Sequence, residues 1–265
     1  MHTISINEVI DYARCPMLYF FKYKAKDVKT EYINLVEKYD EDIHKVIYYA
    51  FTNVQDGKGI EIKDIKASWG KAWIKDKRKS HIMFNESLST KDTYNERRRK
   101  GLLSLLRFQK EFTNNPGFPI AINLPYKIPI TKNLELTGNF ELIRENELKE
   151  IEVFTFKTDE HANTKVTKEN DLKLVASSIA IKDYVKSDNI KHIMYHVDKF
   201  NYSIHNNNDL NKEFFIYSVK NIFKSIYNNI YYMGPDSNCY VCPYKDICSN
   251  KSKVIQILDK EYVKC

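Results

Sequence analysis

The strongest pattern in this chain is a stripe of apolar residues at helical spacing from Tyr32 to Val54. A stripe of this kind covers one face of a helix and predicts that this face packs against a core. Gly57 and Gly59 follow the stripe and predict where the helix ends. A shorter helix is expected from Ser5 to about Lys24, with a kink or break at Pro16 because proline cannot donate the helical hydrogen bond.

The pattern changes to strands at Phe118, after a helix expected from about Thr93 to Phe112. Residues Phe118–Ile130 are mostly apolar, and Leu134–Arg144 with Lys149–Lys157 predict a hairpin. A helix, a strand and a helix are then expected over about Lys168–Tyr184, His192–Tyr202 and Leu210–Tyr232. The order of these elements favours an α/β fold with a mixed central sheet flanked by helices.

The whole chain, residues 1–265, is expected to form a single domain. Within it we expect a helical insertion at about 60–117, a central sheet at 118–204 and a cysteine cluster at 234–250. No apolar stretch is long enough to span a bilayer, so a soluble protein of the reducing cytoplasm is expected, without a membrane partner. The formal net charge of +7 permits binding of a polyanion but does not require it.

Three of the five cysteines, Cys239, Cys242 and Cys248, lie close together near the end of the chain, while Cys15 lies near its start. Clustered thiols in a reducing compartment favour metal binding over disulfides. The spacing alone leaves a zinc ion and an iron–sulfur cluster equally open, because both take four thiolates. Cys265 has no neighbouring ligand and is expected to be a free thiol.

The residues around the first cysteine resemble the opening of a known nuclease family. Tyr12-Ala13-Arg14-Cys15-Pro16 followed by Tyr19-Phe20-Phe21, together with the three later cysteines, is similar to the iron–sulfur exonucleases of the PD-(D/E)XK superfamily. These include the CRISPR-associated RecB-like exonucleases and the nuclease domain of AddB-type helicase–nucleases. The resemblance implies the restriction-endonuclease-like fold, DNA as the partner, as single strands or ends, and a [4Fe–4S] cluster on the four cysteines that joins the two termini.

The same resemblance implies a nuclease site that depends on Mg²⁺ or Mn²⁺. Such ions, held by carboxylates, polarise the phosphate and activate water, and a lysine steadies the developing charge. His44 matches the family's helix histidine, Glu141 matches its first acid, and Lys157 matches the lysine of its acid-x-Lys motif. His44 and Glu141 are therefore the candidate metal ligands, and all three residues are the candidate catalytic residues.

Two positions depart from the family's pattern. Thr155 stands where the acid of the acid-x-Lys motif belongs, and Lys173 stands where the following helix often has glutamine. A threonine in place of a carboxylate predicts weakened metal binding. Asp159 is one candidate substitute acid. Glu152 is the other, although alternation along a strand turns it away from Lys157 unless a bulge shifts the register.

Two basic runs, Arg97-Arg98-Arg99-Lys100 and Lys75–Lys79, are candidate nucleic-acid contacts together with Lys173. A solvated helix face is the simpler explanation of each run alone. The aromatic run Tyr19-Phe20-Phe21 could stack on bases, but packing within a core is favoured.

Three functions stay open from the sequence. The protein is a DNA-binding member of the resembled family with weak or lost cleavage, an active metal-dependent DNA exonuclease, or a non-enzymatic subunit of a larger assembly with protein partners. Thr155 favours the first and the third, whereas His44 and Lys157 keep the second open.

Overall fold

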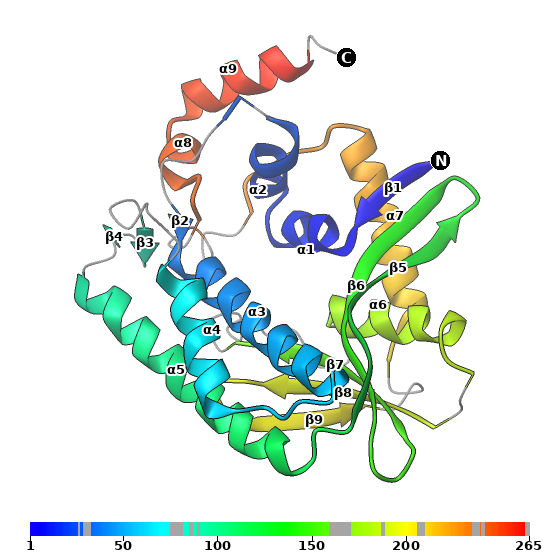
Figure 1. Ribbon diagram of the computed structural model, residues 1–265. Coiled ribbons are helices and arrows are strands. Elements are labelled where there is room, and N and C mark those ends of the chain that lie inside the picture. Colours follow the sequence, from blue (N-terminus) through cyan, green and yellow to red (C-terminus); the bar gives the residue numbers. More distant parts are fainter. Residues whose placement is uncertain are drawn as a thin grey trace.

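The computed structural model describes residues 1–25, 27–28, 33–74, 82–84, 87–88, 91–158, 171–186, 189–205, 210–234, 239 and 242–262. Helices lie on both faces of a central sheet, with α3, α4 and α5 on one face and α1, α6 and α7 on the other (Figure 1). No helix in the described ranges is both long and apolar enough to cross a membrane.

The helices, in chain order, are α1 (Ile6–Arg14), α2 (Pro16–Tyr19), a π-helical turn (Phe20–Lys24), α3 (Leu35–Gln55), α4 (Ile62–Ile74), α5 (Lys91–Asn114), α6 (Leu172–Ala180), a 3₁₀ turn (Ile181–Asp183), α7 (Lys212–Tyr227), α8 (Lys245–Ser249) and α9 (Lys251–Tyr262). The strands are β1 (His2–Ser5), β2 (Ile33–Asn34), β3 (Ile82–Phe84), β4 (Ser87–Leu88), β5 (Phe118–Thr131), β6 (Leu134–Glu145), β7 (Ile151–Lys157), β8 (Ile190–His196) and β9 (Asn201–His205). This element order confirms the expected mixed α/β architecture.

The central sheet leaves a gap beside the middle of β6. Its strand order is β1-β6-β7-β8-β9, and β5 pairs with the other edge of β6. On the edge away from β5, β1 runs parallel to residues 134–137 and β7 runs antiparallel to residues 142–145. Residues 138–141 lie between these two ladders, and this gap positions the candidate site.

The structure confirms the two N-terminal helices that the sequence predicts. The amphipathic stripe forms α3, and Gly57 follows with a φ of +77°, a conformation that glycine adopts without strain. The expected break is also present, because α1 ends at Arg14 and Cys15 is extended before Pro16 begins α2. Ser5 caps α1 by accepting a hydrogen bond from the main-chain N–H of Glu8.

Two expectations about the second half of the chain are wrong. The single strand expected over His192–Tyr202 is two antiparallel strands, β8 and β9, joined by a tight turn in which Phe200 has a φ of +53°. The helix α7 ends earlier than expected, at Tyr227, and Asn229 follows with a φ of +54°. Both turns depend on left-handed residues other than glycine, which the apolar pattern does not reveal.

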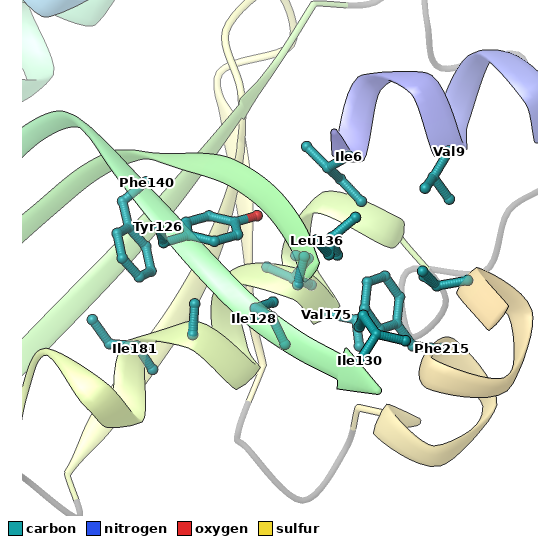
Figure 2. Packing of buried hydrophobic residues seen from close by; sticks show 14 of the residues in the cluster. Ile6, Val9, Tyr126, Ile128, Ile130, Leu136, Phe140, Val175, Ile181 and Phe215 are labelled. Carbon is teal, nitrogen blue, oxygen red and sulfur yellow. The ribbon is translucent and has the colours of Figure 1, made fainter. Parts of the chain in front are cut away.

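Separate hydrophobic cores lie on the two faces of the sheet. In the first, side chains from α1, the β5–β6 hairpin, α6 and α7 meet (Figure 2). In the second, Trp69 and Trp73 of α4 pack beside Tyr39 of α3. Gly101 of α5 lies so close that a Cβ atom there would overlap the Trp69 ring. The segment expected as a helical insertion therefore covers one face of the sheet and shares a core with it.

Candidate functional site

The gap beside β6 brings Glu141 together with His44 of α3. The Nε2 atom of His44 lies 3.5 Å from Oε2 of Glu141. Its Nδ1 atom lies 2.8 Å from the main-chain oxygen of Asp40, one turn earlier on α3. The main-chain N–H of Phe156 donates to the same Oε2 of Glu141 at 2.5 Å, because the β6–β7 ladder has already ended at this point. Two of the three candidate catalytic residues are thus in direct proximity.

Charge interactions shift the pKa values of both partners. Burial favours the neutral carboxyl, but the charges of Lys173 and His44 hold the pKa of Glu141 at about 2. Burial also disfavours the charged imidazole, but the Glu141 and Asp40 carboxylates raise the pKa of His44 to about 9. At neutral pH the two groups therefore form an ion pair.

The start of α6 adds two lysine–carboxylate pairs to the same region. The side chain of Asp171 caps α6 by accepting hydrogen bonds from the main-chain N–H groups of Lys173 and Leu174. The same carboxylate lies 2.8 Å from Nζ of Lys157, at the end of β7. In the first turn of α6, Nζ of Lys173 lies 3.4 Å from Oε1 of Glu141. Lys157 therefore contacts Asp171, and the lysine that lies beside Glu141 is Lys173.

The sequence motifs did not identify two carboxylates of this site, Asp40 and Asp171. Asp40 lies 3.6 Å from Nδ1 of His44 and accepts a hydrogen bond from the Thr158 hydroxyl at 2.8 Å. Its signal was present, since a residue four positions before His44 shares its helix face. Asp171 directly precedes an apolar helical run, which is the position of an N-cap residue.

The register of β7 is that of a regular strand. Its pairing with β8 runs without interruption from Ile151 to Lys157, so Thr155 shares the face of Lys157, as the alternation predicted. Glu152 lies on the opposite face, where it accepts a hydrogen bond from Nε of Arg144 at 2.7 Å. The prediction that Glu152 serves as a substitute acid is therefore wrong. Asp159 lies outside the described residues.

The residues present do not fit the divalent metal site that the family motif implies. The position of the motif's second acid is occupied by Thr155, whose side chain is a buried hydroxyl. Both oxygens of Glu141 already have partners of positive charge or N–H character, in Lys173, His44 and Phe156. Among the described residues, His44, Glu141 and the carboxylates beside them do not form a group of three ligands that could hold a metal ion.

Cysteines from both ends of the chain converge at a second site. The segment after α7 lies along α1 and α2, since the Tyr12 hydroxyl donates to the Ile230 carbonyl at 2.6 Å and the Met17 N–H donates to the Tyr232 carbonyl at 3.1 Å. Gly234 then donates its N–H to Sγ of Cys15 at 3.3 Å, and a Cβ atom on this glycine would crowd Cys15.

The three later cysteines come shortly after Gly234 in the chain. The N–H of Cys242 donates to the Cys239 carbonyl at 3.1 Å, and α8 carries Cys248. Burial and the neighbouring Cys15 and Cys239 thiols raise the pKa of Cys242 to about 11, and the same causes raise the pKa of Cys248. The four thiols are therefore neighbours, although they do not stand in coordination geometry.

The aromatic run after Cys15 packs beside the cysteines. Tyr19, Phe20 and Phe21 are each 2% exposed, and the Phe21 ring stacks on Tyr244 with 5.4 Å between centroids. The prediction that this run packs in a core is confirmed. The run is not exposed to bases.

The basic run on α5 divides into two parts. Arg98 and Arg99 are exposed. Arg97 is half-buried with its guanidinium 6.0 Å from the centre of the Tyr39 ring, and Lys100 lies 3.4 Å from the buried carboxylate of Asp198. Of this run, Arg98 and Arg99 are thus placed as surface contacts. The run Lys75–Lys79 lies outside the described residues.

The sequence matches a known nuclease superfamily over nearly its whole length. The sequence pattern of the PD-(D/E)XK nuclease superfamily matches residues 3–249. A solved structure described as the crystal structure of SSO0001 is 11% identical, with a TM-score of 0.42 over 93% of this chain and 85% of that chain. No curated protein matches the sequence.

Proposed function

Since the chain belongs to the PD-(D/E)XK nuclease superfamily, we propose that it binds DNA and that its phosphodiester cleavage is weak or lost. One observation carries this proposal: the Glu141 carboxylate is paired with the Lys173 ammonium while Thr155 supplies no second carboxylate. Divalent ions in nuclease sites depend on several oxygen ligands with negative charge. Among the described residues, the site retains lysines that suit a phosphate, while its motif positions supply one carboxylate, Glu141, and no second.

The charges around the site support contact with a polyanion. Lys157 and Lys173 are 22% and 33% exposed, whereas the Glu141 side chain is 9% exposed. The ammonium groups therefore lie nearer to solvent than the carboxylate between the strands. Arg98 and Arg99 add exposed positive charge on α5. Single strands or DNA ends are the expected ligands, because the resembled exonucleases act on them.

The test combines a binding measurement with a cleavage assay. We expect salt-sensitive binding of a fluorescent single-stranded oligonucleotide, with affinity falling as salt rises. We also expect no release of label from end-labelled single-stranded DNA in Mn²⁺. Efficient cleavage that Lys157→Ala abolishes would establish the active exonuclease instead. Failure to bind DNA at 0.1 M salt would favour the non-enzymatic subunit with protein partners.

Residual cleavage is favoured by one observation, the position of Asp171. Its carboxylate lies 2.8 Å from Nζ of Lys157. The N-cap of α6 therefore supplies a carboxylate beside the lysine of the acid-x-Lys motif, whose own acid is absent. Asp171→Asn separates the two roles of this residue, because asparagine keeps the N-cap of α6 but cannot carry the charge. If cleavage occurs in Mn²⁺, Asp171→Asn should remove it without changing the melting temperature by more than a few degrees.

We further propose that Cys15, Cys239, Cys242 and Cys248 hold a [4Fe–4S] cluster, with zinc as the alternative. The support is the convergence of four thiols from both ends of the chain. Thiolates are the ligands that both centres take. When bound, the cluster would supply structural cross-linking, and the four cysteines would hold α1, α2 and α8 together.

Metal analysis of the purified protein tests this assignment. A cluster predicts four iron and four sulfide per chain by stoichiometry, with broad visible absorption that bleaches on reduction. One zinc per chain and a colourless protein would replace the cluster by zinc. Neither metal in protein purified without oxygen would overturn the assignment.

A further inference from the structure

The Glu141 carboxylate has a positive or N–H partner on each oxygen. Oε1 lies 3.4 Å from Nζ of Lys173. Oε2 lies 3.5 Å from Nε2 of His44 and accepts the Phe156 N–H at 2.5 Å. A divalent ion that bound this carboxylate would have to displace the ammonium or sit beside it, where like charges a few ångströms apart repel strongly.

Each described lysine of the site is paired with a carboxylate. Lys173 lies 3.4 Å from Glu141, and Lys157 lies 2.8 Å from Asp171. A site built to hold a divalent ion has an excess of negative charge instead. The lysine on α6 therefore supplies the positive charge that Glu141 needs inside the protein.

We propose that the Lys173 ammonium takes the place of a divalent cation on Glu141, so that Lys173 and Lys157 bind phosphate oxygens of the DNA backbone directly, without a metal ion. This inference rests on the proposed function and specifies how its site engages the ligand. An ammonium has three N–H donors, of which Lys173 directs one toward Glu141. Its side chain is 33% exposed, so the remaining donors can reach a phosphate at the surface.

The first experiment measures binding of a fluorescent single-stranded oligonucleotide at matched ionic strength, with EDTA or with Mg²⁺. We expect the dissociation constants to agree within about twofold. In EDTA, Lys173→Gln should weaken binding about fivefold at 0.1 M salt and reduce the salt slope by about 0.7, as loss of one phosphate contact predicts. Lys173→Arg retains the charge and should stay within about twofold of the wild type.

Lys182→Gln is the matched control for Lys173→Gln. Lys182 is an exposed lysine of the 3₁₀ turn after α6, and its substitution removes the same charge away from Glu141. It should change the affinity by less than twofold. Thermal melting of each variant separates a loss of contact from a loss of fold, and Lys173→Arg provides the folded comparison.

The second experiment measures Mn²⁺ binding by electron paramagnetic resonance, without reference to activity. Thr155→Glu restores the acid beside Lys157, and Lys173→Gln removes the internal ammonium. We expect each single variant to gain little Mn²⁺ affinity. The double variant should bind Mn²⁺ at least tenfold more tightly than the product of the two single effects predicts. Equal Mn²⁺ affinity in Thr155→Glu and in the double variant would overturn the role of Lys173.

The outcomes separate this inference from the proposed function. Absence of DNA binding by the wild type would remove the proposed function and the inference together. DNA binding that disappears in EDTA, or a Lys173→Gln variant that behaves like Lys182→Gln, would overturn the inference alone.

Discussion

The imidazole of His44 and the carboxylate of Glu141 approach to 3.5 Å between α3 and the gap beside β6. This contact links folding to pH. The pKa of His44 is raised to about 9 in the folded protein, because the Glu141 and Asp40 carboxylates outweigh the effect of burial. In the unfolded chain a histidine titrates near 6.5.

The first prediction concerns the stability curve between these two values. A group with a raised folded pKa stabilises fully below its unfolded pKa, and this stabilisation is lost as pH rises through the folded pKa. The contribution of His44 should therefore fall by up to about 3 kcal/mol between pH 6.5 and pH 9. Urea unfolding of His44→Gln should show a flatter curve over that window, whereas His2→Gln, at an exposed position, should keep the wild-type slope.

The second prediction concerns Glu152, on the opposite face of β7. Its carboxylate pairs with Arg144 at 2.7 Å, and both side chains are about nine-tenths buried. Glu152→Ala removes the carboxylate partner of the guanidinium, which still donates to the main-chain carbonyls of Asn115 and Pro116, and should destabilise the protein by about 3 kcal/mol. DNA affinity, measured well below the melting temperature, should stay within twofold. A folded Glu152→Ala variant with impaired DNA binding would contradict the orientation of this strand.

The third prediction concerns Gly138, which begins the stretch of β6 inside the gap. A Cβ atom there would overlap the ring of Tyr126, which is 2% exposed. Gly138→Ala should therefore cost about 1–3 kcal/mol, and the cost should shrink in a Tyr126→Leu background. Gly70→Ala is the control, because nothing lies within 4 Å of the new methyl group and the position is helical. It should be neutral or slightly stabilising.

The fourth prediction separates the arginines of α5. Arg99→Gln removes an exposed charge and should weaken binding of single-stranded DNA without changing stability. Arg97→Gln removes a half-buried guanidinium that lies 6.0 Å from the Tyr39 ring, and should lower the melting temperature instead. The two variants carry the same charge change, so equal effects on DNA affinity would show that only net charge matters.

The fifth prediction concerns the cysteines. Cys15→Ser removes the thiol that the N-terminal half contributes, and should lower both the bound iron and the melting temperature. Cys265→Ser, at a position expected to carry a free thiol, should change neither quantity. Full iron content in Cys15→Ser would exclude this residue from the ligand set.

Local patterns in the sequence were sufficient for the long elements. The apolar stripe of α3 and the break at Cys15 follow from side-chain periodicity and from the geometry of proline, which act over a few residues. Alternation along β7 likewise placed Thr155 on the face of Lys157, because successive side chains of a strand point to opposite faces. The turn between β8 and β9 escaped prediction because it uses Phe200 at positive φ.

The sequence by itself determined which residue types stand in the motif positions, including a threonine for an acid and a lysine for a glutamine. Only the tertiary structure decided that Lys173 lies on Glu141 and that Asp171 lies on Lys157. Both pairs join the start of α6 to strands that precede it in the chain. The first depends on where β1 and β7 leave β6 unpaired, and the second on α6 starting near the end of β7. Local periodicity carries no information about such distances, because they are fixed by the packing of helices on the sheet.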